Sequence, residues 1–190
     1  MTVDARRLVD KLWSYVHVLR DDGVGVLDYT EQLIYLLFLK MAHERATRPL
    51  KPEQVLPEQY SWQRLMDARG QELEAVYTGM LQGLSREPGV VGTIFRKAQS
   101  RIQDPAKLRR IIVDLIGAQQ WSQSGTDLNG DAYEAILARS ASDGSSGAGQ
   151  YFTPRALIEA IVDAVDPTVE DSVVDPAAGT GGFLLVAHDH

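Results

Sequence analysis

The 190-residue sequence contains no cysteine. Disulfides and thiolate zinc sites are therefore excluded, and a reducing cytoplasm is the expected setting. The most apolar run, residues 33–39, has seven residues. Because roughly 20 are needed to cross a bilayer, this run predicts a buried helix and no membrane segment. The four histidines, His17, His43, His188 and His190, show no metal-ligand spacing with a carboxylate cluster, so we expect no metal site.

Basic residues are scarce in the last fifty positions. Residues 141–190 hold one basic residue, Arg155, against eight acidic ones, which together account for the net charge of -7. The first 140 residues are balanced in charge, so this part can still present a local basic face. A run of six cations stands out there: Arg96, Lys97, Arg101, Lys107, Arg109 and Arg110. Contact with DNA phosphates or an acidic partner is one interpretation, and a solvated helix face is the other.

Helical periodicity dominates residues 1–139, and no strand alternation is evident there. Apolar spacing predicts helices over residues 3–20, 28–45, 61–66 and 71–84, and others starting at 105 and 127. Asp28 and Glu31 fit a capping box at the start of the second helix. Asp104-Pro105 supplies a cap followed by proline at the first helical position. We therefore expect an all-α N-terminal domain over residues 1–139.

The composition then shifts to the Ser/Gly-rich stretch "SASDGSSGAG", residues 140–149, which predicts a linker. Residues 150–190 form the second part. Thr153 is the expected N-cap of a helix that starts at Pro154 and ends near residue 165. The apolar residues expected to face a core are Leu157, Ile158, Ile161, Val162 and Val165. "DSVVDP" is interpreted as a short buried strand whose last residue is Asp175.

The glycine-rich turn "PAAGTGG" (residues 176–182) follows this strand and precedes another helix. A strand, a glycine turn and a helix in that order bring an anion within reach of free N–H groups. Its glycines are spaced G-x-G-G, which matches neither the dinucleotide fingerprint nor the P-loop. From spacing alone, a ligand cradle and a merely tight turn both remain open.

Two stretches together carry a closer resemblance. "GQYFTPR" (149–155) precedes "DPAAGTGGF" (175–183), and the pair resembles the S-adenosylmethionine motifs of N6-adenine DNA methyltransferases. More narrowly, the chain resembles the methyltransferase (modification) subunit of Type I restriction–modification systems. Residues 12–44 are similar to that family's N-terminal helical domain, and residues 127–137 to the helix before its linker. The resemblance implies a mainly α chain: a helical bundle, then the beginning of a Rossmann-like α/β domain.

The resemblance also implies S-adenosylmethionine as cofactor. The helix N-terminus at Thr153 would meet its carboxylate, and the aromatic pair before it would lie near the sulfonium. The implied binding residues are Gln150, Tyr151, Phe152, Thr153, Pro154, Arg155, Asp175, Gly179, Thr180, Gly181 and Gly182. Several have plainer alternatives: the aromatics as core residues, Thr153 as a cap, Arg155 as a solvated cation and Asp175 as a turn cap.

The sequence has no Pro-Pro pair. The Asn/Asp-Pro-Pro-aromatic motif, with which such enzymes hold a flipped adenine, is therefore not in this chain. We expect an N-terminal part of a longer enzyme that is inactive by itself. The parent would methylate adenine N6 in DNA, together with a specificity subunit and a restriction/motor subunit, while the helical domain serves DNA closure and subunit contacts. The alternatives are a non-catalytic helical module that binds a partner subunit or DNA, and a different nucleotide-dependent enzyme.

Overall fold

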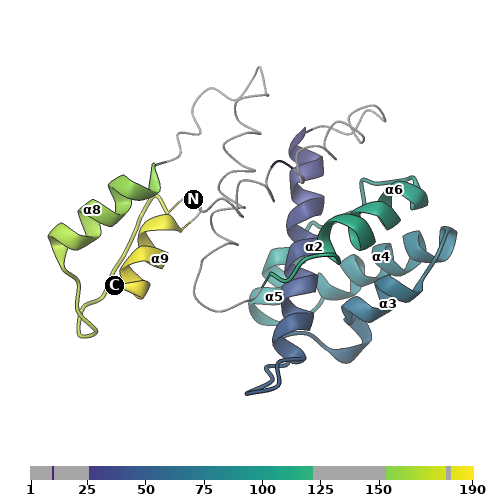
Figure 1. Cartoon of the computed structure of the whole chain (residues 1–190), viewed down its shortest axis with the longest axis horizontal. Helices are drawn as coiled ribbons and strands as arrows, with labels where there is room; N and C mark the ends of the chain where they lie inside the picture. Colours follow the sequence, from purple (N-terminus) through teal and green to yellow (C-terminus); the bar gives the residue numbers. More distant parts are fainter. Residues whose placement is uncertain (1–9, 11–25, 122–152, 179–180) are drawn as a thin grey trace. The chain divides into compact units, whose positions relative to one another are not determined.

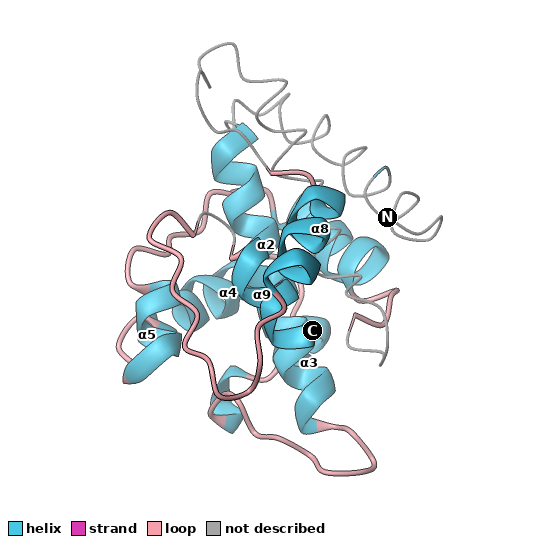
Figure 2. Ribbon diagram, turned by 90° about the vertical axis from the view of Figure 1, so that its left-hand side faces the viewer, coloured by secondary structure: helices cyan, strands magenta, loops and turns pink. Residues whose placement is uncertain are grey.

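The computed structural model describes Asp10 and residues 26–121, 153–178 and 181–190. These residues form helices and loops, and none of them forms a strand (Figure 2). The predicted mainly helical class is confirmed. The chain divides into two units, Met1–Gly144 and Ser145–His190. The expected helices over 3–20 and from 127, and the expected linker at 140–149, lie outside the described residues, and the domain bounds stay a prediction.

Helix α2 (Val26–Ala46) is the centre of the first unit. Figure 1 shows it crossing the bundle, with the shorter helices gathered beside it. The apolar run 33–39 was predicted to form a buried helix, and the buried residues of α2 confirm this: Tyr29, Leu33, Tyr35, Leu36, Leu37, Leu39 and Ala42. A helix that is apolar all round is stable only when neighbours cover it on several sides.

Shorter elements follow α2 in the first unit. They are η1 (Glu58–Tyr60), α3 (Trp62–Asp67), α4 (Gln71–Leu84), α5 (Gly89–Phe95), α6 (Pro105–Arg110) and the π-helix η2 (Ile111–Ile116). The helices expected over 61–66 and 71–84 are thus confirmed as α3 and α4. Residues 85–88 separate α4 from α5. Helix α5 begins at Gly89, whose φ is 71°.

The start of α6 is the one predicted from Asp104-Pro105. The Ala106 N–H donates to Asp104 Oδ1 at 2.8 Å, and Pro105 is the first helical residue. After Arg110 the helix widens into η2, and the Gly117 N–H donates to the Ile112 carbonyl, five residues back, at 2.7 Å. The apolar side chains of this combined helix, Leu108, Ile111, Ile112 and Leu115, are all buried.

The capping box expected at Asp28 and Glu31 is wrong. Within the described residues α2 already begins at Val26, so Asp28 lies inside the helix. The Glu31 carboxylate instead accepts a 2.8 Å hydrogen bond from the Tyr35 hydroxyl, one turn further on. Because Val26 and Leu27 are already helical, their carbonyls lie at the i−4 positions of Thr30 and Glu31, whose amides a cap at Asp28 would otherwise satisfy.

Buried tryptophans close the bundle. Trp62 and Trp121 are each 2% exposed and anchor the core. The Trp121 N–H donates to both Glu44 carboxylate oxygens, at 2.9 and 3.2 Å. Its indole N–H donates to the Ile116 carbonyl at 2.8 Å. These bonds hold residue 121 against α2 and the end of η2.

The second unit contains α8 (Arg155–Val165) and α9 (Gly182–Asp189). Its buried core consists of Ile158, Val162 and Val186, with Phe183 and Ala187 packed against it. The expectation of a broader buried face on α8 is wrong, because Leu157, Ile161 and Val165 are 52%, 39% and 70% exposed. Among the described residues, it is the side of α8 facing α9 that has a partner to bury it.

Two further expectations for this unit are corrected. Pro154, not Thr153, occupies the N-cap position of α8, and no side-chain cap bond is made there. Residues 171–175 are not a strand, and Val173 and Val174 are 47% and 83% exposed. A strand exists through hydrogen bonds to a neighbouring strand, and no described segment pairs with this one.

Candidate functional site

The predicted cofactor site is described in part. Gln150, Tyr151, Phe152, Gly179 and Thr180 lie outside the described residues. The described members are Thr153, Pro154, Arg155, Asp175, Gly181 and Gly182. They fall at two places, the N-terminus of α8 and the turn that leads into α9. Whether all eleven residues meet around one ligand therefore stays a prediction.

The turn before α9 depends on Gly181. This residue is left-handed, with φ 80° and ψ 17°, a conformation that costs L-residues other than glycine roughly 1 kcal/mol or more. A Cβ placed on it would meet nothing within 4 Å, so the space above the backbone is open. The first intrahelical bond runs from the Leu185 N–H to the Gly181 carbonyl at 2.9 Å. The amides of residues 182–184 are therefore the ones that helix geometry leaves for a cap or an anionic ligand.

Asp175 lies six residues before this glycine. Its Oδ1 accepts the Ala177 N–H at 2.9 Å, so the side chain caps the turn that follows, which is the plainer of its two interpretations. A carboxylate offers about four lone-pair positions, and this bond uses one of them. Asp175 can therefore hold the turn and still accept from an ammonium group.

Arg155 opens α8 and is largely covered. Its side chain is 21% exposed, and Nε lies 3.8 Å from Oε1 of Glu159, one turn along the helix. A cation in the first helical turn is disfavoured by the helix dipole. The plainer interpretation of Arg155 as a solvated residue does not fit this burial.

The six cations of residues 96–110 have different surroundings. Arg109 is structural: its Nη1 donates to the carbonyls of Met66 and, at 3.1 Å, Ala68, where α3 ends. Arg96, Lys97 and Arg101 are exposed on the loop between α5 and α6. The remaining two, Lys107 and Arg110, belong to α6, where Lys107 is half-buried and Arg110 exposed. The run is thus not one uniform face.

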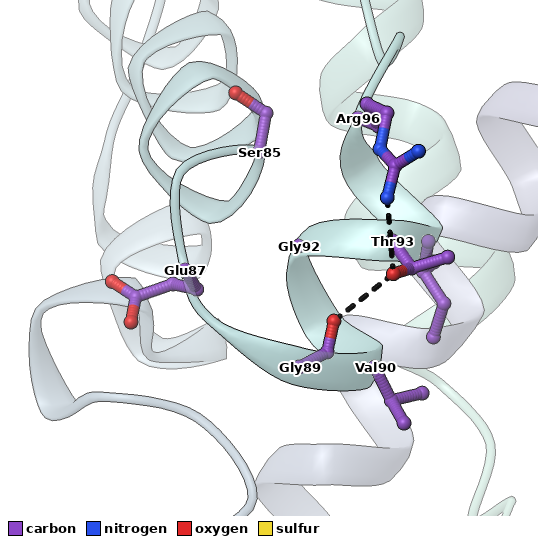
Figure 3. A pocket seen from close by; sticks show the side chains of 8 residues that line it. Ser85, Glu87, Gly89, Val90, Gly92, Thr93 and Arg96 are labelled. Atoms are coloured by element: carbon purple, nitrogen blue, oxygen red, sulfur yellow. Dashed lines mark hydrogen bonds between the residues drawn. The ribbon is translucent and has the colours of Figure 1, made fainter.

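Arg96 also borders an open hollow of about 530 Å³ beside α5. Figure 3 shows its guanidinium directed at Thr93, whose hydroxyl in turn donates to the Gly89 carbonyl at 3.1 Å. The Arg96 Nη2 to Thr93 Oγ1 distance is 3.5 Å, so this contact is weak. The guanidinium is accordingly available at the surface.

Comparisons with known proteins match two family descriptions along the chain. Residues 8–115 match the family described as HsdM N-terminal domain, and residues 124–190 match N-6 DNA Methylase. The first match covers more than half of the chain. The chain belongs to the methylase subunits of Type I restriction enzymes.

Individual members of this family are similar along nearly the whole chain. The StySJI methylase subunit of Salmonella typhimurium is 39% identical over 185 residues, which is 95% of this chain and 34% of that protein. The EcoKI methylase subunit of Escherichia coli is 37% identical over 184 residues, again 95% and 34%. The crystal structure of the EcoKI M protein matches with a TM-score of 0.53 and 32% identity over 96% of this chain and 31% of that one. The chain thus spans about a third of the length of these relatives.

The sequence pattern missed Gln32, a buried polar residue of this methylase-family chain. Gln32 lies on α2 between the buried Tyr29 and Leu36 and is 0% exposed. A glutamine within an apolar helix is the signal that could have indicated a buried polar contact, because such a group is seldom buried without hydrogen-bond partners. Its partners, however, are 45 to 69 residues away in sequence and leave no local pattern.

Two kinds of feature are missing from the described residues. Among residues 26–121, 153–178 and 181–190, no cluster of three or more histidine, aspartate or glutamate side chains could hold a metal ion. No helix in the same ranges is both long and apolar enough to span a membrane.

Proposed function

We propose that this chain is the N-terminal part of a DNA methyltransferase subunit that, when complete, transfers a methyl group from S-adenosylmethionine to adenine N6 in DNA. The observation that carries the proposal is the left-handed Gly181 turn, which opens α9 within the segment that matches N-6 DNA Methylase. A Cys-free composition supports a cytoplasmic protein, where its DNA substrate is also found.

The described residues fit the methionine end of the cofactor. S-adenosylmethionine supplies a methyl group on a positively charged sulfur, which an amine can accept. Both helix N-termini, the one at Thr153 and the first-turn amides of α9, suit a carboxylate, and Asp175 suits an ammonium. Arg155, at the start of α8 and 21% exposed, lies with its Nε 3.8 Å from Oε1 of Glu159 on the same helix. These residues bind and orient the ligand.

The residues that would hold the target adenine are not among those in this chain, since the Pro-Pro tetrapeptide is absent. We therefore propose that the chain by itself transfers no methyl group. In the complete subunit the helical domain would contact DNA and the specificity subunit, and a restriction/motor subunit would join for cleavage. The names of the relatives, methylase subunits of Type I restriction enzymes, support this assembly.

Calorimetry on the full-length parent tests the cofactor site. Gly181→Asp places a carboxylate where the amides of α9 would receive the carboxylate of S-adenosylmethionine, and we expect affinity to fall at least tenfold. Gly181→Asn is the matched control, because it has nearly the same shape and tolerates left-handed backbone but carries no charge. Its affinity should fall less than that of the Asp variant. Wild-type affinity in Gly181→Asp would remove the turn from the site.

The reaction itself is tested with the parent and its specificity subunit on duplex DNA. Mass spectrometry of the digested DNA should detect N6-methyladenine and no methylcytosine. The 190-residue chain under the same conditions should leave the DNA unmodified. The proposed reaction would be contradicted if the complete assembly formed methylcytosine or left the DNA unmethylated.

A further inference from the structure

We propose that residues 96–103, which we call the basic loop, form a preorganised surface for the phosphate backbone of duplex DNA. The inference rests on the proposed function and specifies which part of the helical domain meets DNA. The basic loop has the sequence RKAQSRIQ, with three cations and no acidic residue. It lies between α5 and α6 (Figure 1), and the exposed Asp104, the N-cap of α6, follows it.

Apart from the partly buried Ser100, the basic loop buries its apolar side chains and exposes its polar ones. Its inward residues, with Phe95 just before them, anchor it in the core: Phe95, Ala98 and Ile102 are 0%, 7% and 2% exposed. Phe95 packs on the Tyr35 and Phe38 rings of α2, at centroid distances of 5.1 and 5.6 Å. The exposed residues are Arg96, Lys97, Gln99, Arg101 and Gln103.

Gln32 of α2 holds the backbone of the basic loop from the buried side. Its Nε2 donates to the Gln99 carbonyl at 2.9 Å, and its Oε1 accepts the Arg101 N–H at 3.3 Å. The Tyr77 hydroxyl of α4 donates to the same Oε1 at 3.1 Å. One buried amide thus holds both a carbonyl and an N–H of the loop, and Tyr77 fixes the amide. A loop that is ordered before binding loses less entropy when it binds.

The charges on the basic loop remain available to a ligand. The ion pair of Arg101 with Asp28 spans 3.6 Å, and both side chains are about half exposed, so water screens it strongly. Arg96 has its weak contact to a neutral hydroxyl. Within the described part of the chain, Lys97 has no acidic group at ion-pair distance. Arg109, in contrast, is occupied by the carbonyls of Met66 and Ala68.

The composition of this surface favours DNA over an acidic protein. Protein interfaces are built around apolar and aromatic anchors, and the exposed side of the basic loop has none. Arginine, lysine and glutamine are the residue types that contact phosphate oxygens. Cations at positions 96, 97 and 101 on an ordered support can contact phosphates at a smaller cost in loop ordering.

The first experiment measures affinity for a random-sequence duplex against salt concentration, using fluorescence anisotropy and the 190-residue chain. Each phosphate contact contributes about 0.9 to the slope of log affinity on log salt. The double variant Arg96→Ala/Lys97→Ala should therefore bind more weakly and lower the slope by about 1 to 2. The control Lys51→Ala/Arg69→Ala removes the same charge from other exposed loops of the first unit and should keep the slope.

The second experiment replaces Gln32 by methionine, which keeps the length and loses both loop bonds. We expect faster amide exchange in residues 96–103 and a severalfold weaker affinity, with the salt slope of the wild type, because the same cations still reach the DNA. A slope change would mean that the contacts themselves are lost and would contradict preorganisation. If Gln32→Met fails to fold by circular dichroism, the first experiment still decides the DNA surface.

Equal effects of the two double variants would overturn the inference, because the binding would then be diffuse charge attraction. Loss of specificity-subunit binding in Arg96→Ala/Lys97→Ala with unchanged DNA affinity would also overturn it, in favour of a protein-docking surface. Neither result touches the proposed methyl transfer, which is judged by cofactor calorimetry and by adenine methylation. The two proposals can therefore fail separately.

Discussion

Single residues in one charged run differ in what they do, and Arg109 shows it most clearly. Its guanidinium holds the backbone where α3 ends, through the carbonyls of Met66 and Ala68. Arg109→Ala should destabilise the fold by about 1–3 kcal/mol, as expected when hydrogen bonds to a charged group are lost. Urea unfolding measures this, with the exposed Lys97→Ala as a control within about 0.5 kcal/mol. Wild-type stability in Arg109→Ala would return the residue to the candidate DNA contacts.

His43 makes the first unit sensitive to acid. Burial lowers the pKa of His43 from its ordinary 6.5, positively charged Lys40 lowers it further, and Glu44 opposes both. As pH falls through about 6.5, the unfolded chain binds a proton that the folded chain does not, so stability falls with pH until the folded pKa is reached. Urea unfolding between about pH 8 and 5 should show this loss. His43→Gln should reduce the slope, and an unchanged slope would exclude His43 as its source.

At the scale of elements, two glycines of neighbouring helices make opposite predictions. A Cβ on Gly92 of α5 would lie 1.8 Å from the Glu87 carbonyl oxygen, whereas one on Gly79 of α4 would meet nothing within 4 Å. Gly92→Ala should therefore destabilise by about 1–3 kcal/mol through a forced backbone shift. Gly79→Ala should stabilise by up to about 1 kcal/mol, since alanine is the better helix former. Thermal melts distinguish them, and equal melting temperatures would contradict the packing at Gly92.

The elements that the sequence predicted well are those with local causes. The Asp104-Pro105 cap lies within one helical turn, and α4 has its own apolar face and flanking breaks, so both were predictable. The contacts of Gln32 and Arg109 join residues more than 40 positions apart, and no local pattern contains them. The Asp28 capping box was misread because the pattern is also compatible with the interior of a longer helix. The strand at 171–175 and the buried face of α8 were misread because both require partners that the described second unit does not supply.

The cofactor residues show the same division within the site. The left-handed turn at Gly181 could be anticipated from the glycine spacing, since only glycine takes φ near 80° without strain. The turn-capping bond of Asp175 was the plainer of two alternatives, and the sequence could not choose between them. The low exposure of the Arg155 side chain could not be predicted from the sequence either, because it depends on how α8 packs.

At the scale of the whole molecule, the two units differ in how much apolar surface they bury. The first contains a continuous core around α2 and α4, while the buried core of the second consists, among its described residues, of Ile158, Val162 and Val186. The second unit also exposes Val165 and Val174 at 70% and 83%. Small cores rarely stabilise a fold by themselves. Stability measured on this chain should therefore report chiefly on its helical first unit.

This difference can be tested with tryptophan fluorescence, because all three tryptophans, Trp13, Trp62 and Trp121, lie within Met1–Gly144. Leu36→Ala removes a fully buried side chain of α2 and should destabilise the fluorescence-detected transition by about 2–5 kcal/mol. Ile158→Ala, at a comparably buried position of α8, should leave that transition within about 0.5 kcal/mol. An equal shift in both variants would mean that the units unfold together. An unshifted transition in Ile158→Ala would mean that the free energy of unfolding of the first unit does not depend on the packing of α8.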